Sequence, residues 1–338
     1  MKDYNVVVVG VGMVGKQMIE ILLERKFPFR SLRILATRSR MESIAGRDFS
    51  VEETTLESFK GVDIAFFAGT EGEKGASMLF AKKAAEMGVM VIDNGGDFRM
   101  DPDIPLVVPE VNPSHLDSHH GIIANPNCST IQLVVALSPL HRAFRLTEAI
   151  VTTFQAVSGT GRQAVEELDN QIRGYVAGQE VPPQVYPYSI AGNVIPRIGS
   201  LSSTFPGYFT EEVKMVMESR KILDHPTLHI SSTCVRVPVF NGHSEAVTAR
   251  FADPFEEKEV RSLLSVAPGI CLIDDPEHDG YPVPLSLSQS NEVFVGRIRR
   301  NSAFPDALDM WVVADNIRKG AALNAVQIAE TMIERSLL

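Results

Sequence analysis

The sequence predicts an α/β protein with two domains, the first built on a parallel sheet and the second of α+β type. In the first 130 residues short apolar runs alternate with helical patterns, which is typical of βαβ units. Later in the chain strand-like runs become longer and follow one another, which favours a mixed or antiparallel sheet. The 338 residues are enough for two separate hydrophobic cores.

The N-terminal half of the sequence predicts the parallel sheet. Helices are expected at about 15–25 and 73–87, each between two apolar runs. We expect buried strands at 5–9, 32–35, 62–67, 89–92 and 122–124.

The second half predicts a sheet with separate helices. A final amphipathic helix at 316–335 is expected to return to the first domain, which gives domains of 1–128 with 316–338 and of 129–315. Strands are expected at 149–157, 229–239, 244–251, 293–298 and 308–313, and helices at 161–176, 210–223 and 256–265.

The charge balance excludes some classes of partner. The chain has 32 basic and 42 acidic residues and a net charge of −10, which argues against nucleic acid or an anionic membrane surface as partner. No apolar run is long enough to span a membrane, and no signal peptide is expected. Three cysteines are an odd, sparse set that suits a reducing cytoplasm.

A glycine pattern follows the first apolar run. Gly10, Gly12 and Gly15 are spaced as GxGxxG, with a strand before them and a helix after them. Glycines there permit a tight turn and let a pyrophosphate approach the helix N-terminus. We therefore predict a dinucleotide site at Gly10, Gly12, Met13, Val14 and Gly15, the alternative being a plain turn.

The end of the second strand distinguishes the two nicotinamide cofactors. An NAD site usually carries Asp or Glu there, whereas this chain has Thr37-Arg38-Ser39-Arg40. Two guanidiniums and two hydroxyls suit a 2′-phosphate, so the pattern favours NADP. The alternative is that these arginines are only solvated.

Cys128 stands where an apolar run ends at Asn125-Pro126 and an amphipathic run begins at Ser129-Thr130. A thiol at a helix N-terminus meets unpaired N–H groups and the helix dipole, which favour the thiolate. Cys128 is therefore a candidate nucleophile. The alternative is a small buried hydrophobic residue at a strand end.

Polar residues elsewhere fit such a site. Arg236 lies in an apolar strand and needs a carboxylate or phosphate partner, and His243 follows in a turn where an imidazole can act as acid or base. Gln155 ends a strand, and Arg99 lies in a loop after a parallel strand, at the edge where such sheets bind ligands. Each has a plain alternative, a structural histidine or a solvent-facing side chain.

These motifs resemble the aspartate-β-semialdehyde dehydrogenase family along essentially the whole chain. The resemblance implies a Rossmann-type domain and a catalytic and dimerisation domain, as in glyceraldehyde-3-phosphate dehydrogenase. The matching segments are GxGxxG, Asn125-Pro126-Asn127-Cys128-Ser129-Thr130, Gln155-Ala156-Val157-Ser158-Gly159, Arg236 with Gly242-His243-Ser244, Val107 to Asn112, Val295 to Arg299 and Lys319 to Ala322.

The resemblance also implies roles for single residues. It implies that Cys128 forms an acyl-thioester, that His243 is the general acid/base and that Gln155 assists catalysis. It implies substrate contacts from Arg99, Asn127, Gln155, Glu211, Lys214 and Arg236, with Arg236 on the substrate α-carboxylate and Arg99 and Lys214 on the phosphate. It implies cofactor contacts from the glycine turn, Arg38, Ser39, Ser158, Gly159 and Asn316, and no metal.

The implied reaction is NADP-dependent, reversible reduction of L-aspartyl 4-phosphate to L-aspartate 4-semialdehyde. It serves lysine, diaminopimelate, threonine, methionine and isoleucine biosynthesis in a cytoplasmic homodimer or homotetramer. Related alternatives are an N-acetylglutamyl-phosphate reductase and a non-catalytic paralogue. The chain departs from the family at the glycine turn, which is one residue shorter than GxxGxxG, at Gly95-Gly96 in place of two serines, and at 41–44.

Overall fold

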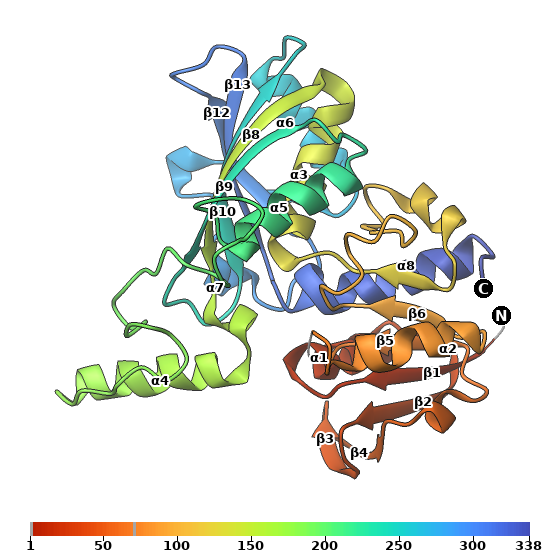
Figure 1. Ribbon diagram of the computed structural model, residues 1–338. Helices are drawn as coiled ribbons and strands as arrows, with labels where there is room; N and C mark the ends of the chain where they lie inside the picture. The colour runs from red at the N-terminus through yellow and green to blue at the C-terminus, as the bar shows by residue number, and fades with distance from the viewer. Residues whose placement is uncertain (1–2, 70–71) are drawn as a thin grey trace. The chain divides into compact units, whose positions relative to one another are not determined.

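The computed structural model describes residues 3–69 and 72–338. The chain forms two compact units, one of Met1–Pro126 with Ala321–Leu338 and one of Asn127–Gly320. Each unit is built on one sheet (Figure 1). Within the described ranges, every helix is too short or too polar to cross a lipid bilayer.

The first unit contains a seven-stranded sheet in the order β3-β4-β2-β1-β5-β6-β7. Every pair from β4 to β7 is parallel, as the alternating pattern predicts, and β3 pairs with β4 antiparallel at the edge. The strands are β1 (Tyr4–Val9), β2 (Phe29–Ala36), β3 (Arg40–Ile44), β4 (Arg47–Glu53), β5 (Ile64–Phe67), β6 (Met90–Asp93) and β7 (Ile122–Ala124).

Both faces of this sheet are covered, which explains its continuous apolar strands. On one face, α1 (Met13–Glu24) and α8 (Leu323–Glu334) pack together and bury the alternate residues of β1 and β5. On the other, Phe67 stacks on Phe59 with ring centroids 5.8 Å apart. The sheet is therefore of the Rossmann type.

Three features of this unit differ from what the sequence predicts. The hairpin of β3 and β4 was not expected, because its alternating residues are largely charged and half exposed. The helix expected at 73–87 begins only at Ser77, as a π-helical turn to Ala81 followed by α2 (Lys82–Glu86). The final helix also begins later than expected, with a π-helical turn at Arg318–Ala322.

The second unit contains a six-stranded mixed sheet in the order β11-β12-β13-β10-β8-β9. β8 pairs parallel with β9 and antiparallel with β10, which confirms the predicted mixed sheet. The strands are β8 (Leu146–Gln155), β9 (His229–Arg236), β10 (His243–Phe251), β11 (Ile270–Leu272), β12 (Val293–Arg300) and β13 (Ala307–Ala314).

Two of these strands end earlier than expected. β8 ends at Gln155, because Val157–Thr160 forms a 3-10 turn. β9 ends at Arg236, two residues before Pro238, whose nitrogen cannot donate to a ladder. Both ends place a long polar side chain at the same edge of the sheet, since Gln155 pairs with Arg236.

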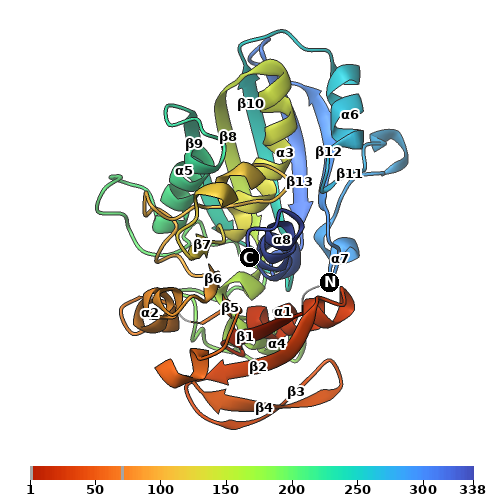
Figure 2. The same ribbon diagram turned by 90° about the vertical axis from the view of Figure 1, so that its right-hand side faces the viewer.

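Helices cover one face of the second sheet. α3 (Cys128–Phe144) packs against β8, β10 and β13, and α5 (Thr210–Ile222) packs against β9 (Figure 2). The other face is more open, and Ile150 of β8 is 50% exposed there. The remaining helices of the unit are α4 (Arg162–Val176), α6 (Glu257–Val266) and α7 (Pro284–Leu287).

The three glycines after β1 have different reasons to be glycine. Gly10 has φ +108° and packs against the Ala68 backbone, where a Cβ would lie 2.7 Å from the carbonyl oxygen. A Cβ on Gly15 would overlap the carbonyl oxygen of Gly10. Gly12, the N-cap of α1, has nothing within 4 Å of its Cβ position, so its surroundings are open.

This difference in packing predicts that alanine substitutions at Gly15 and Gly12 change the free energy of unfolding by different amounts. Gly15→Ala forces α1 away from the turn and should lower the free energy of unfolding by about 1–3 kcal/mol, the usual cost of overpacking. Gly12→Ala should cost less than about 1 kcal/mol, as a substitution at an open N-cap. Thermal and urea unfolding of both variants measure the difference, and equal stabilities would contradict the close packing at Gly15.

Candidate active site

Cys128 is the first residue of α3, as the sequence predicts. Asn127 is the N-cap, and its Oδ1 accepts hydrogen bonds from the N–H groups of Ser129 (3.0 Å) and Thr130 (3.3 Å). The cap orients the first turn so that the positive end of the helix dipole lies beside the thiol. A Cβ built on Gly320 would lie 2.9 Å from Cys128 Cβ, so the backbone at Gly320 packs closely against this residue.

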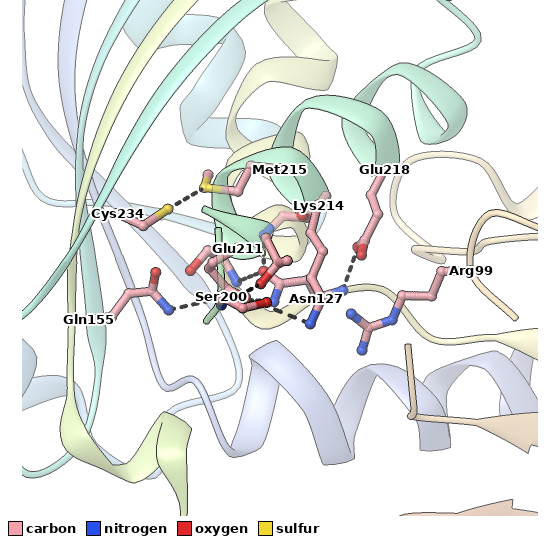
Figure 3. Close-up of polar contacts among 12 residues, drawn as sticks. Arg99, Asn127, Gln155, Ser200, Glu211, Lys214, Met215, Glu218 and Cys234 are labelled. Atoms are coloured by element: carbon pink, nitrogen blue, oxygen red, sulfur yellow. Dashed lines mark hydrogen bonds and ion pairs between the residues drawn. The ribbon is translucent and has the colours of Figure 1, made fainter. Parts of the chain in front are cut away.

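Two carboxylates of α5 hold Asn127 in place (Figure 3). Asn127 Nδ2 donates to Glu211 Oε1 at 2.9 Å, and the Asn127 backbone N–H donates to Glu218 Oε2 at 2.7 Å. Both acids are buried and lie seven residues apart, two turns along one helix face. The residue before the thiol is therefore fixed through its side chain and its backbone.

The same Glu211 oxygen connects this cap to the sheet. Gln155 Nε2 donates to Glu211 Oε1 at 3.1 Å and lies 3.4 Å from His243 Nε2. The Ala156 N–H donates to His243 Nδ1 at 3.1 Å, so a neutral imidazole carries its proton on Nε2. Burial and the nearby Arg236 cation lower the pKa of His243 well below its usual value, so this ring is neutral at pH 7.

Arg236 belongs to the same cluster. It is buried, and its Nη1 donates to the Ala156 carbonyl at 2.6 Å. A Cβ on Gly159 would lie 3.0 Å from Arg236 Nη1 and 3.1 Å from His243 Nε2, so the guanidinium and the imidazole face one small space beside Gly159. Arg236 Nε has no hydrogen-bond partner in the described structure, although it is buried. A buried donor of this kind suits a ligand carboxylate.

The charge of Glu211 is set by its neighbours. Burial alone would raise the pKa of Glu211, but the Lys214 cation and hydrogen bonds from Asn127 and Gln155 outweigh it and lower the pKa. Lys214 Nζ lies 3.8 Å from Glu211 Oε2. The cluster thus contains a stable buried carboxylate beside two cations, Lys214 and Arg236.

The other two thiols are in less reactive positions. Burial raises the pKa of Cys234, and the buried Cys234 Sγ contacts Met215 Sδ at 3.6 Å. Burial also raises the pKa of Cys271 on the short strand β11. None of the three cysteines forms a disulfide within the described residues, and Cys128 is the one at a capped helix N-terminus.

Three of the predicted cofactor residues lie together in the second unit. Ser158 Oγ donates to Asn316 Oδ1 at 3.1 Å, and the same Oδ1 accepts the Gly242 N–H at 2.9 Å. Gly159 follows Ser158 in the 3-10 turn. This small network therefore connects the turn after β8 to the residue before His243.

The predicted dinucleotide residues lie in the first unit. A cavity of about 520 Å³ is lined by Gly10 and Gly12 and, at the end of β2, by Thr37 and Arg40. Met13 and Val14 are the first residues of α1. The open N-cap at Gly12 and this cavity provide the space and free N–H groups that a dinucleotide phosphate needs, so these residues fit a nicotinamide dinucleotide.

Arg38, Ser39 and Arg40 differ in their surroundings. Arg40 Nε donates to Glu42 Oε1 at 2.8 Å, and Glu42 also pairs with Lys16 at 2.8 Å. Hydrogen bonds from Arg40 and Lys16 lower the pKa of Glu42 to about 2. Arg38 is exposed, and Ser39 Oγ accepts the Glu53 N–H at 3.2 Å. Arg40 is therefore engaged with Glu42, while Arg38 points its charge to solvent.

Arg99 is also part of the first unit and is buried there. Its Nε donates to the Asn125 carbonyl at 2.9 Å and its Nη2 to the Asn94 carbonyl at 2.9 Å. These carbonyls follow β7 and β6, so Arg99 lies at the carboxyl edge of the parallel sheet, where the sequence places it.

Sequence reasoning missed some of the residues that build this site. The Glu218 carboxylate binds the Asn127 backbone, and the Ala156 N–H donates to His243. Neither Glu218 nor Ala156 has a sequence signal of its own. Thr37 and Arg40 belong to the run that favours NADP in the sequence, and both line the cavity, although the resemblance implies cofactor contacts only from Arg38 and Ser39 of this run. Within the described ranges, no group of three His, Cys, Asp or Glu side chains could hold a metal ion.

Comparison with family models identifies both halves of the chain. Residues 5–119 match the model "Semialdehyde dehydrogenase, NAD binding domain", and residues 137–319 match "Semialdehyde dehydrogenase, dimerisation domain". The chain is 45% identical to the aspartate-semialdehyde dehydrogenase of Aquifex aeolicus, over 99% of both chains. It is 42% identical to that of Bacillus subtilis, over 100% of this chain and 99% of the relative.

Solved structures agree with these matches. Aspartate semialdehyde dehydrogenase II of Vibrio cholerae, complexed with ASA, has a TM-score of 0.93 and 40% identity over 99% of each chain. The aspartate semialdehyde dehydrogenase of Candida albicans with NADP has a TM-score of 0.76 and 25% identity over 100% of both chains. By sequence and by structure, this chain belongs to the aspartate-semialdehyde dehydrogenase family of oxidoreductases.

Proposed function

We propose that the chain catalyses the reversible, NADP-dependent reduction of L-aspartyl 4-phosphate to L-aspartate 4-semialdehyde. The observation that carries this proposal is the placement of Cys128 on a capped helix N-terminus whose cap, Asn127, shares Glu211 with Gln155. The family membership supplies the reaction class, and the buried charges supply the substrate class.

In the first step the Cys128 thiolate attacks the acyl carbon of aspartyl phosphate. A carbon–sulfur bond forms, the carbon–oxygen bond to phosphate breaks, and a thioester on Cys128 results. We assign the leaving phosphate to Lys214 and Arg99, because two cations lower the cost of bringing a phosphate dianion to a thiolate.

In the second step the thioester carbon is reduced to the aldehyde. A nicotinamide bound to the first unit would supply the hydride. His243 presents its Nε2–H, which donates to the carbonyl oxygen and stabilises the negative charge that develops there. Collapse of the tetrahedral adduct restores the Cys128 thiolate and releases the aldehyde. His243 as proton acceptor in the oxidative direction remains a prediction.

Substrate specificity follows from two buried charges. We propose that Arg236 binds the α-carboxylate through the Nε that has no partner in the described structure. The Glu211 carboxylate favours a substrate with a free α-ammonium group. An N-acetylated substrate has no such cation, so the site supports aspartyl phosphate over N-acetylglutamyl phosphate.

We assign different functions to the two domains. We propose that 1–128 with 316–338 is the NADP-binding domain and 129–315 the catalytic and dimerisation domain, with Ser158, Gly159 and Asn316 as cofactor contacts. The open face of the second sheet, with half-exposed Ile150, supports a homodimer built on this domain, and light scattering separates a dimer from a tetramer. Three cysteines without a disulfide among the described residues support a cytoplasmic location. We propose that the reaction serves lysine, diaminopimelate, threonine, methionine and isoleucine biosynthesis.

For the cofactor, we propose NADP over NAD. The 2′-phosphate would contact Arg38 and Ser39, because Arg40 is already engaged with Glu42. Arg38 is exposed and forms no ion pair among the described residues, so its guanidinium can turn onto the phosphate without breaking one. A charge-assisted bond of this kind stabilises bound NADP but is absent with NAD.

The nucleophile is tested by Cys128→Ala. This variant should fold with a wild-type circular dichroism spectrum and lose phosphate-dependent reduction of NADP by aspartate semialdehyde, because no thioester can form. Cys271→Ala is the matched control and should keep its activity. Turnover by Cys128→Ala at the wild-type rate would contradict the proposal, and a preference for N-acetylglutamate semialdehyde in the wild type would favour the related reductase.

The cofactor proposal is tested by Arg38→Ala. Fluorescence titration should show a Kd for NADPH raised about tenfold or more, the effect of losing one charge-assisted contact, with the Kd for NADH nearly unchanged. Arg30→Ala removes an exposed arginine at the opposite end of β2 and should leave both constants unchanged. An equal loss of NADPH and NADH affinity in Arg38→Ala would refute a 2′-phosphate contact.

A further inference from the structure

A second polar layer lies directly behind the predicted catalytic side chains in the sheet. Gln155 of β8 pairs with Arg236 of β9 on one side. On the other side Phe154 pairs with Ser244 of β10, so His243 of β10 lies beside Gln155. Two residues further along these strands, Thr153 pairs with both Cys234 and Glu245. Because side chains alternate along a strand, Glu245 shares its sheet face with His243.

Glu245 is an unusual residue for this position. Its exposure is 0%, and neither carboxyl oxygen has a hydrogen-bond partner in the described structure. Its cross-strand neighbour Val312 and the next residue on the same face, Val247, are buried and apolar. An ionised carboxylate is strongly disfavoured in such surroundings, so a neutral carboxylic acid is the expected form.

The side chain that faces Glu245 is Gln132 of α3. Burial raises the pKa of Glu245 well above its usual value, and the Gln132 amide opposes this rise. Gln132 is itself 0% exposed, and its Nε2 and Oε1 are without hydrogen-bond partners among the described residues. The four polar atoms of these two buried side chains therefore have no hydrogen-bond partners among the described residues, a situation that native structures resolve by pairing.

A neutral acid and an amide are complementary. The carboxylic O–H can donate to the Gln132 oxygen, while the Gln132 N–H donates to the carboxyl carbonyl. A carboxylate has no proton to donate, so it would leave the Gln132 oxygen unmatched. The small rotamer adjustment that brings the two groups together satisfies all four atoms.

Gln132 and Glu245 lie at similar distances, along their own elements, from the two predicted catalytic residues. Gln132 follows Cys128 by four residues, one turn along the same face of α3, which is about 6 Å. Glu245 follows His243 by two residues, about 7 Å along β10. A bond between Gln132 and Glu245 therefore fixes the distance between the helix that carries the thiol and the strand that carries the imidazole.

We propose that Glu245 and Gln132 form a neutral acid–amide pair that positions Cys128 relative to His243. Both are positioning residues and neither touches the substrate. The expected effect on kcat rests on the proposed function. The existence of the pair rests only on the packing of the core.

Four variants test the pair. Glu245→Gln preserves shape and complementary bonding and should keep kcat within about threefold of the wild type. Glu245→Leu and Gln132→Leu each leave one polar group unmatched and should lower kcat by about tenfold to a hundredfold, the effect of a small misplacement of reacting groups, with KM nearly unchanged. In the double leucine variant the fold-decrease in kcat should be smaller than the product of the two single fold-decreases.

Two further measurements separate positioning from general stability. Val247→Ala weakens the same core and should lower the Tm without lowering kcat. The alkylation rate of Cys128 without substrate should fall in both single leucine variants and recover in Glu245→Gln. This rate requires no turnover, so it tests the pair even if the proposed reaction proves wrong.

An infrared spectrum tests the protonation state directly. At pH 7 the wild type should show the carbonyl band of a protonated carboxylic acid, and Glu245→Gln should lack it. A loss of kcat in Glu245→Gln as large as in Glu245→Leu would overturn the proposal, since the carboxyl itself would then be required. Wild-type kcat and alkylation in a folded Glu245→Leu variant would overturn it as well.

Discussion

The site depends on the hydrogen bonds of one side chain, Asn127. Its oxygen caps α3 and sets the first turn, and its nitrogen binds Glu211, which also binds Gln155. A helix N-terminus favours a thiolate only if its N–H groups are held in register, and the cap does this from the residue next to the thiol. The same Glu211 oxygen aligns the cap with the sheet edge that presents His243. Loss of Asn127 would therefore disturb both the first turn of α3, which carries Cys128, and the contact between Glu211 and Gln155.

Electrostatics explain why so many charges are buried here. Arg236, Glu211 and His243 are all nearly inaccessible, which is costly for isolated ions. The cost is reduced because Glu211 lies beside Lys214 and Arg236, and because His243 is neutral. What remains is a site with one cationic position whose Nε has no partner in the described structure, suited to a carboxylate. The cluster thus presents a buried cationic donor, to which our proposal assigns the substrate carboxylate.

Much of the fold and the site could be predicted from sequence, for identifiable reasons. Buried parallel strands are continuous apolar runs, and the turn after β1 has no room for a side chain at Gly10 and Gly15, so both leave local signals. Cys128 and His243 could be proposed as site residues because short motifs surround them. The hairpin of β3 and β4 was missed because charged, half-exposed strands such as Arg40–Ile44 lack an apolar alternation. Glu218 and Glu245 were missed because their partners lie about a hundred residues away and each looks like an ordinary acid in its own element.

The central claim is that Cys128 carries the acyl group during catalysis. The most direct measurement is peptide mass mapping after the wild-type protein is mixed with aspartyl phosphate in the absence of nicotinamide cofactor and quenched in acid. The account predicts one aspartyl group per active chain, on the peptide that contains Cys128, and its release as the semialdehyde when NADPH is added before the quench. An adduct on another residue, or full turnover with no adduct on Cys128, would contradict it.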